Sequence, residues 1–174
     1  MPASEQGIDP RRYALIPRVL VFLTRGEHVL LIKGAPSKRI WPNLYNGVGG
    51  HIERGEDPLT AAYREVHEET GLVMRELGLS GIVTVDTGQN PGIGVFIFRG
   101  ECPEGDILAS NEGIPEWVQC DHLGDLPLVE DLHSLLPRIL AMKAGDLPFF
   151  AQYHYDDQDR LAIQFRDQEG FRYG

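Results

Sequence analysis

Cysteine is scarce in this chain. Only Cys102 and Cys120 occur, and they show neither the C-x-x-C spacing of a redox site nor the spacing of a metal site. We expect both to be reduced, buried small residues rather than a disulfide, which favours a cytoplasmic protein. No apolar run approaches the ~20 residues that a membrane-spanning helix needs. Residues 1–12 lack the apolar centre of a signal peptide, so no membrane partner is expected.

Basic residues are also few. The chain has 16 Lys and Arg against 26 Asp and Glu, which gives a formal net charge of −10. Such an acidic surface argues against binding to a polynucleotide, which usually needs a basic patch. A free nucleotide stays open as a small-molecule partner, because one bound cation can reverse the local field. With 174 residues, the chain is long enough for one domain with a substantial core.

Runs of apolar and β-branched residues predict several strands and two helices. The first strands, 18–24 and 28–33, flank a turn at 25–27 and form a hairpin, which a loop follows at 34–43. The remaining elements are expected as strands at 45–48, 79–86, 94–98 and 116–120, a loop at 101–114, a second helix at 130–143 with a break at Pro137, and a terminal hairpin of 149–155 and 161–165.

The first helix has clear end signals. Asp57 suits the N-cap, Pro58 suits the first helical position, and Gly71 suits the left-handed residue just past the end. Helical periodicity predicts an apolar face that packs on the sheet, formed by Leu59, Ala62, Tyr63 and Val66. A second face, roughly 110° away, is expected to point into a cleft and carries Glu65, Glu68 and Glu69.

These three glutamates stand three and four residues apart, so a helix projects all of them from one side. Two unit charges ~6 Å apart at an effective dielectric constant of ~20 repel each other by roughly 3 kcal/mol. Such a cluster does not serve stability, and the simplest relief is a hard divalent cation with oxygen ligands. The helix therefore predicts a metal site.

The spacing around these acids matches a known pattern. Gly50 is followed after five residues by Glu56, and after seven more by Arg64-Glu-Val-His-Glu-Glu-Thr-Gly-Leu72. This segment resembles the Nudix box, which reads G, five residues, E, seven residues, R-E-U-x-E-E-x-G-U, with U aliphatic. All nine specified positions agree, and the chance of such a match in a chain of this length is on the order of 10⁻⁷ at ordinary residue frequencies.

The resemblance implies an α/β fold in which an α/β/α sandwich surrounds a mixed β-sheet. It implies a domain over residues 15–143, with a flexible tail at 1–14 and a C-terminal β-hairpin extension of the same domain at 144–174. It also implies an enzyme that uses Mg²⁺ or Mn²⁺ to hydrolyse a nucleoside diphosphate linked to another group. Many relatives are homodimers, and both a monomer and a homodimer stay open.

The resemblance also assigns roles to single residues. Arg64 is expected to brace the loop by pairing with Glu56, and Glu65 to form part of the group that activates water. The implied metal ligands are the carbonyl of Gly49 and the carboxylates of Glu65, Glu68 and Glu69. Glu112 resembles the loop acid that adds a metal contact in the MutT-like branch, and a solvated loop charge is the alternative.

Three features outside the box resemble the branch of 8-oxo-dGTP diphosphatases. Asn46, which precedes Gly47, resembles the residue whose amide binds the purine, and a turn before glycine is the alternative. Glu130 and Asp131 resemble acids that approach the base, although acids are also common at helix starts. Lys33 matches a basic position that contacts phosphates, and a strand-end lysine pointing at water is equally ordinary.

The chain also departs from this branch. His51 stands where a lysine often follows the double glycine, so the contacts of that lysine are not implied. For the aromatic residues of the terminal hairpin, and for Trp41 and Trp117, we favour simple packing over contact with a base.

The branch favours the hydrolysis of an oxidised purine nucleoside triphosphate to the monophosphate and pyrophosphate. ADP-ribose, a nucleotide sugar and a dinucleoside polyphosphate are the alternative substrates. A non-catalytic nucleotide-binding domain is disfavoured because every acid of the box is present. An isoprenoid isomerase is disfavoured because neither cysteine lies in a recognisable isomerase site.

Overall fold

The structure, a computed structural model, describes residues 2, 5–7, 9, 11–102 and 104–166. Its elements in chain order are β1 (Leu15–Arg25), β2 (His28–Gly34), β3 (Tyr45–Asn46), β4 (Val48–His51), α1 (Pro58–Thr70), β5 (Gly78–Asp86), β6 (Gly92–Glu101), β7 (Gly113–Gln119), the 3₁₀ helix η2 (Cys120–Asp125), α2 (Leu132–Ala141), β8 (Phe149–Tyr155) and β9 (Leu161–Arg166).

The strands form one mixed sheet in the order β3-β2-β1-β6-β5-β8-β9, with β4 paired to β1 and β7 paired to β2. The pairs β1–β6 and β5–β8 are parallel, and the other pairs are antiparallel. β1 changes its antiparallel partner along its length: Arg18 to Val21 pair with β4, whereas Thr24 and Arg25 pair with β2. This change of partner places the glycines of β4 beside the first half of β1.

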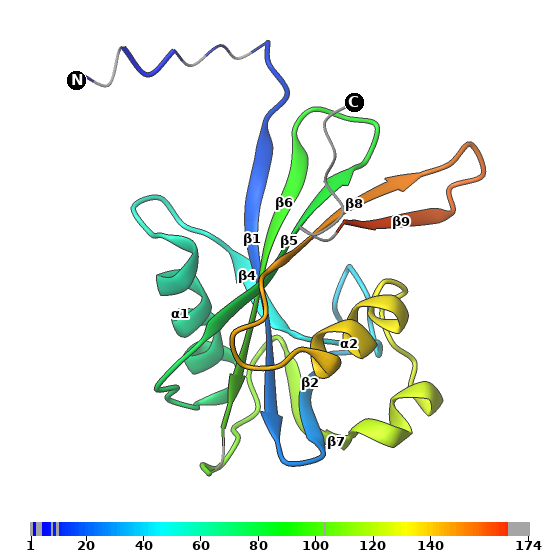
Figure 1. Cartoon of the computed structure of the whole chain (residues 1–174). Helices are drawn as coiled ribbons and strands as arrows, with labels where there is room; N and C mark the ends of the chain where they lie inside the picture. Colours follow the sequence, from blue (N-terminus) through cyan, green and yellow to red (C-terminus); the bar gives the residue numbers. More distant parts are fainter. Residues whose placement is uncertain (1, 3–4, 8, 10, 103, 167–174) are drawn as a thin grey trace.

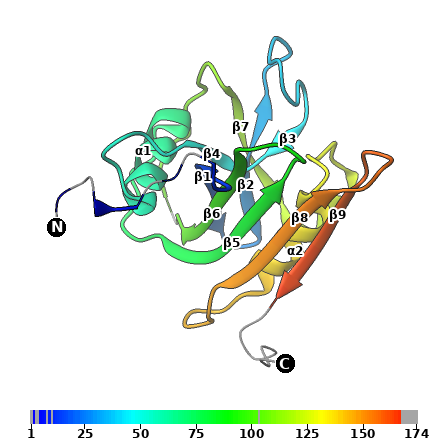
Figure 2. The ribbon, with the colours of Figure 1, turned by 90° about the horizontal axis from the view of Figure 1, so that it is seen from above.

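The sheet separates two apolar cores, and alternate residues of β1 serve one or the other. Val19, Val21 and Leu23 pack with residues of α1, whereas Leu20 and Phe22 pack with residues of α2. Figures 1 and 2 show α1 and α2 on opposite sides of the sheet. The expected α/β/α sandwich around a mixed sheet is therefore confirmed.

Helix α1 begins and ends where its sequence signals predicted. The Asp57 carboxylate accepts hydrogen bonds from the backbone N–H groups of Leu59 at 2.8 Å and Thr60 at 3.0 Å. At the other end, Gly71 adopts a left-handed φ of 75°, and its N–H donates to the carbonyl of His67. These bonds satisfy backbone groups that a helix leaves without partners at its ends.

The expected apolar face of α1 is partly wrong. Leu59 is 41% exposed, whereas Ala61, Ala62 and Val66 are fully buried against the sheet. The helix is turned so that two small alanines approach the strands closely, and this rotation also brings Glu69 into the buried side. One of the three box acids therefore lies deeper than the helical pattern predicted.

Several strand boundaries differ from the expected ones because pairing extends them. β1 begins at Leu15 rather than 18, since residues 15–17 pair in parallel with the first residues of β6. Gly113 and Ile114 belong to β7 rather than to the loop expected at 101–114, since they pair with the end of β2. The expected strand 45–48 is two short strands, one on β2 and one on β1.

The C-terminal half keeps its expected elements with small shifts. α2 is shorter than expected, and it runs through Pro137 as one helix. The 3₁₀ helix η2 was not predicted. The hairpin β8–β9 is confirmed, and β8 joins the main sheet by parallel pairing with β5. Residues 167–174 of the expected extension lie outside the described residues.

Both cysteines are free, as expected; Cys102 is buried, whereas Cys120 is half-buried rather than buried. Burial raises the pKa of the Cys120 thiol, which makes it a poorer nucleophile. Within the described residues, no helix is both long and apolar enough to cross a membrane.

Candidate active site

The acids of α1 meet the strand β4 at its two glycines. The Gly49 N–H donates a hydrogen bond of 3.0 Å to Glu69 Oε2, and the Glu69 residue is only 6% exposed. A Cβ atom on Gly50 would collide with the Glu65 carboxylate, and one on Gly49 would collide with the backbone of Val19. Glycine at both positions therefore lets the helix bring two carboxylates directly against the strand.

Arg64 holds the loop between β4 and α1 against the helix. Its Nε donates to Glu56 Oε1 at 2.7 Å, and its Nη2 donates both to Glu56 Oε2 and to the His51 carbonyl at 3.0 Å. This two-bonded pair is the geometry in which guanidinium binds carboxylate most specifically. The expected pairing of Arg64 with Glu56 is confirmed.

The same guanidinium also reaches two of the box acids. Arg64 Nη1 donates to Glu65 Oε1 at 2.8 Å and to Glu68 Oε2 at 3.0 Å. Glu68 is the outermost of the three acids, with 58% of its side chain exposed, whereas the side chain of Glu65 is only 12% exposed. The three acids therefore occupy three depths, from the surface to the core.

Burial dominates the electrostatics of the two inner acids. It raises the pKa of Glu69 to about 7, against a smaller lowering effect of the Gly49 N–H. Burial also raises the pKa of Glu65, opposed by its bond to Arg64. A carboxylate in this position is destabilised in its charged form, and a bound cation would favour that form.

The chemistry of these oxygen donors fits Mg²⁺ or Mn²⁺. The arrangement still requires a local adjustment, because in the described parts of the chain no three His, Cys, Asp or Glu side chains converge as a ready-made metal site. Arg64 Nη1 occupies oxygens of both Glu65 and Glu68. Since the Glu68 side chain is mostly exposed, it can turn from this ion pair towards a cation at little cost.

A cavity of about 1360 Å³ connects this acidic cluster with the α2 side of the sheet. One end is lined by Gly49 and the three box acids. The other end has apolar walls from the sheet and from the segment that leads into α2, among them Val83, Val95 and Val129. An anionic group at the acidic end and a flat apolar group at the other end can therefore belong to one ligand.

Two polar side chains face the apolar end. Asn46 uses its Oδ1 to accept a hydrogen bond of 2.8 Å from the Gly47 N–H, which leaves its NH₂ group as the donor for a ligand. Asp131 precedes α2, but its side chain makes no capping hydrogen bond. Burial raises the pKa of Asp131 to about 6. Both residues line the cavity, and the exposed Glu130 lies at its edge.

The family model for the NUDIX domain matches residues 14–139 of the chain. This chain belongs to the Nudix family. It is accordingly a Nudix hydrolase, and the segment from Gly50 to Leu72 is its Nudix box.

Among similar proteins, the oxidized purine nucleoside triphosphate hydrolase of Mus musculus is 29% identical over 154 residues, which are 87% of this chain and 95% of that protein. The NAD-capped RNA hydrolase NudC of Pseudomonas aeruginosa is 31% identical over 134 residues, or 75% of this chain, but the match spans only 46% of NudC. A crystal structure of a MutT protein from Bacillus halodurans superposes with a TM-score of 0.73 at 25% identity, covering 87% of this chain and 97% of that one.

Two further residues assigned from the Nudix resemblance differ in their position relative to the site. The Lys33 ammonium lies 5.5 Å from the centre of the Tyr45 ring, and Lys33 is outside the cavity lining. Glu112 lines the cavity and forms an ion pair of 2.7 Å with Lys38, with 54% of its side chain exposed. The charge of Glu112 still acts on Glu65 and Glu69, so it lies near the Nudix acids.

Among the cavity-lining residues that sequence reasoning did not assign to the site are Arg18, Tyr153 and Tyr155. Arg18 is the cross-strand partner of His51, and its buried Nε has no hydrogen-bond partner among the described residues. The strand alternation of β1 places Arg18 on the same face as Leu20 and could have identified it.

The terminal hairpin only partly follows the expected packing role. Phe149 packs edge-on against Phe165 in the core, with ring centres 5.7 Å apart. Tyr153 is buried in the same core and also lines the cavity, and Tyr155 lines the cavity as well. Of the two tryptophans, Trp117 is not part of the cavity lining. The Arg25 guanidinium lies over its ring, 4.2 Å from the ring centre. Trp41 is 46% exposed and lines the cavity.

Proposed function

We propose that this Nudix pyrophosphohydrolase acts on an oxidised or otherwise non-standard purine nucleoside triphosphate, with the monophosphate and pyrophosphate as products. The supporting observation is the continuous cavity that joins the box acids to an apolar pocket bearing Asn46 and Asp131. A nucleotide has the same division into an anionic and a flat apolar part. The similarity to the mouse hydrolase of oxidised purine nucleotides is consistent with this assignment.

In this proposal the acidic end holds Mg²⁺ or Mn²⁺ through the carbonyl of Gly49 and the carboxylates of Glu65, Glu68 and Glu69. Such an ion neutralises polyphosphate charge and lowers the pKa of a bound water. Glu65 is our choice for the residue that accepts the proton from water. Its carboxylate is nearly buried, and its pKa is raised by burial, which moves it towards the range of an effective base near neutral pH.

Glu69 suits the role of a ligand better than that of a base. One of its oxygens accepts the Gly49 N–H, and it is the deepest of the three acids. Arg64 positions the cluster from the side, because its guanidinium links Glu56, Glu65 and Glu68. We assign Glu112 to an additional contact at the mouth of the site.

At the other end, the apolar walls enclose the purine ring. Asn46 has a free NH₂ donor and is assigned to a ring acceptor atom. Asp131 as a carboxylate accepts hydrogen bonds only, and is assigned to ring N–H groups. The exposed Glu130 contributes negative charge beside it, and the position of Lys33 over Tyr45 gives it at most a contact at the edge of a bound nucleotide.

A dinucleotide or nucleotide-sugar substrate is the second candidate. The cavity volume of about 1360 Å³ exceeds the ~300–1,000 Å³ of common small-molecule pockets. Beyond the acids, the cavity is lined by Lys38, Arg39 and the exposed ring of Trp41. These side chains offer positive charge and a stacking surface to a group attached beyond the diphosphate.

The test is product analysis over a panel with Mg²⁺: 8-oxo-dGTP, dGTP, ATP, ADP-ribose, a nucleotide sugar and a dinucleoside tetraphosphate. The proposal expects the highest kcat/KM for an oxidised purine triphosphate, with monophosphate and pyrophosphate as products. Glu69→Gln protein, checked for folding by circular dichroism, is the control with strongly reduced turnover. Preferred cleavage of ADP-ribose or the dinucleoside compound would favour the second candidate, and turnover by the control at the rate of the unmodified protein would exclude Glu69 from the reaction.

A further inference from the structure

The hydroxyl of Tyr153 is buried without a hydrogen-bond partner among the described residues. Tyr153 lies on β8, and the residue is only 4% exposed. Buried polar groups in native proteins nearly always have a partner, because an unpaired one forfeits its hydration. We therefore expect this hydroxyl to form a hydrogen bond with a group that does not belong to the described part of the protein.

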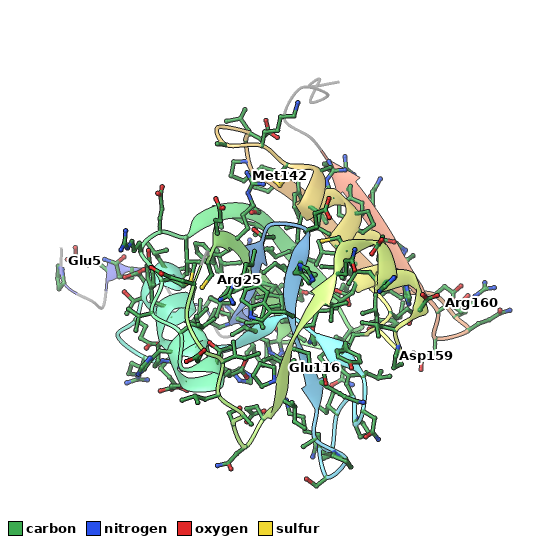
Figure 3. All side chains as sticks on the ribbon, turned by 90° about the horizontal axis from the view of Figure 1, so that it is seen from below. Glu5, Arg25, Glu116, Met142, Asp159 and Arg160 are labelled. Atoms are coloured by element: carbon green, nitrogen blue, oxygen red, sulfur yellow. The ribbon has the colours of Figure 1, made fainter. Side chains whose placement is uncertain are left out.

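Strand register places Tyr153 in the wall of the cavity. Tyr153 pairs with Val85 of β5, and Val85 pairs with Ile93 of β6, so the three side chains share the α2 face of the sheet. All three line the cavity, at the end away from the box acids. Figure 3 shows the turn of this hairpin, marked by Asp159 and Arg160, projecting away from the body of the protein, so the contribution to the cavity comes from the strand itself.

Asp131 is the charged neighbour of this hydroxyl. Val129 and Leu132, on either side of this acid in the sequence, belong to the same apolar core as Tyr153. Burial is the main cause of the raised pKa of Tyr153, and the charge of Asp131 raises it further. No hydrogen bond joins them in the part of the chain that the structure describes. A hydroxyl donor and a carboxylate acceptor thus line the same pocket.

Packing alone does not account for the hydroxyl. Phe149, four residues earlier on the same strand, fills the core without one. Other tyrosines of the chain use theirs: Tyr45 donates to Glu116 at 2.7 Å, and Tyr63 donates to the Arg75 carbonyl at 3.3 Å. Phenylalanine at position 153 would keep the ring contacts and avoid burying an unpaired hydroxyl.

We propose that Tyr153 determines base specificity: its hydroxyl donates to a carbonyl oxygen of the base while Asp131 accepts the adjacent ring N–H. The matching chemical group is the lactam edge of a 6-oxopurine, where N–H and C=O are neighbours. The C-terminal hairpin is then part of the substrate pocket. This inference rests on the proposed function, because it assumes that the pocket holds a nucleobase.

The test compares Tyr153→Phe with the unmodified protein on three triphosphates that share sugar and phosphates: those of inosine, adenosine and purine riboside. Inosine carries the lactam edge, adenosine carries an amino group beside a ring nitrogen, and purine riboside carries neither N–H nor C=O there. We expect kcat/KM for inosine triphosphate to fall about tenfold, mainly through KM, and purine riboside triphosphate to change less than twofold. Equal losses on all three, no loss, or a loss confined to adenosine would overturn the assignment.

A second readout separates recognition from structure. Tyr153→Phe is expected to raise the Tm of the ligand-free protein, because the variant no longer buries an unpaired hydroxyl. A lower Tm would show a structural partner and overturn the proposal. Tyr63→Phe is the matched control, since its hydroxyl already has an acceptor. It should give no rise in Tm and leave the ratios among the three substrates unchanged.

Ligand binding without turnover keeps this inference distinct from the proposed function. Inosine monophosphate should raise the Tm of the unmodified protein more than that of Tyr153→Phe, and purine riboside monophosphate should raise both equally. If triphosphates are not hydrolysed but this difference is found, the proposed reaction fails and the base contact stands. If hydrolysis occurs and the difference is missing, only the base contact fails.

Discussion

Replacing Asp131 by Asn should stabilise the protein in a way that depends on pH. Burial raises the pKa of this carboxyl from 3.8 to about 6. Because the pKa in the folded state is the higher one, the folded state favours the protonated form. The contribution of Asp131 to stability is therefore full below pH ~4 and is lost as the pH rises through ~6. The difference between the two pKa values corresponds to about 3 kcal/mol of unfolding free energy.

Asparagine has nearly the size of aspartate and no charge, so the variant lacks this pH dependence. We expect the stability of Asp131→Asn relative to the unmodified protein to be greater at pH 8 than at pH 5 by about 1.4 kcal/mol, or roughly 3–6 °C in Tm. Urea unfolding in EDTA at both pH values measures it, and the carboxyls common to both proteins cancel. Glu130→Gln, at the exposed neighbouring position, should show almost no such change. An advantage of Asp131→Asn that is the same at both pH values would refute the burial argument.

The same variant should lose selectivity while it gains stability. If Asp131 accepts ring N–H groups, an amide at this position keeps one acceptor oxygen but loses the charge and replaces the second oxygen by a donor, which should lower kcat/KM roughly tenfold. The ratio of kcat/KM between purine triphosphates should change more than kcat does. An unchanged ratio across the panel would remove Asp131 from the base pocket, whatever its effect on stability.

Three further outcomes are expected. Glu68→Gln and Glu69→Gln should each reduce Mg²⁺-dependent turnover on the order of 10²-fold or more, with an unchanged circular dichroism spectrum. EDTA should reduce the turnover of the unmodified protein to a similar extent. Wild-type rates in either variant would contradict the metal assignment. Arg64→Lys should lower stability by roughly 1–3 kcal/mol in urea unfolding, because lysine cannot form both bonds to Glu56, and an unchanged midpoint would argue against a bracing role. Asn46→Ala should shift purine preference more than maximal rate, which the nucleotide panel measures.

The parts of the fold that the sequence predicts well are those with local signals. Asp57, Pro58 and Gly71 mark the ends of α1 through bonds within a few residues of themselves. The start of β1 has no such signal, because residues 15–17 become a strand only by pairing with residues 92–94, far away in the sequence. The rotation of α1 is likewise set by the sheet, which accepts Ala61 more closely than Leu59.

The site divides in the same way. The box acids and Arg64 are neighbours on one helix, so spacing alone brings them together. Arg18 and Tyr153 reach the cavity through the order of strands in the sheet, with β6 and β5 between β1 and β8. A sequence pattern that does not yield strand order cannot place them. The resemblance to one branch of the family also assigned Lys33 to a phosphate contact. In the structure Lys33 lies over the ring of Tyr45, and the motif does not specify how that ring packs.

Both ends of the cavity hold a carboxyl that the fold makes harder to ionise, Glu69 with a pKa of about 7 and Asp131 with a pKa of about 6. In each case burial is the main cause, and in each case the charged form is the one that the proposed chemistry needs. A cation at one end and ring N–H groups at the other would favour ionisation of both. In the proposed function, a nucleotide that brings its metal would therefore restore the charge of both residues at once. Binding at the two ends should thus depend on pH in the same direction, strengthening as the pH rises from 6 to 8, which titration calorimetry with a non-hydrolysable triphosphate can measure.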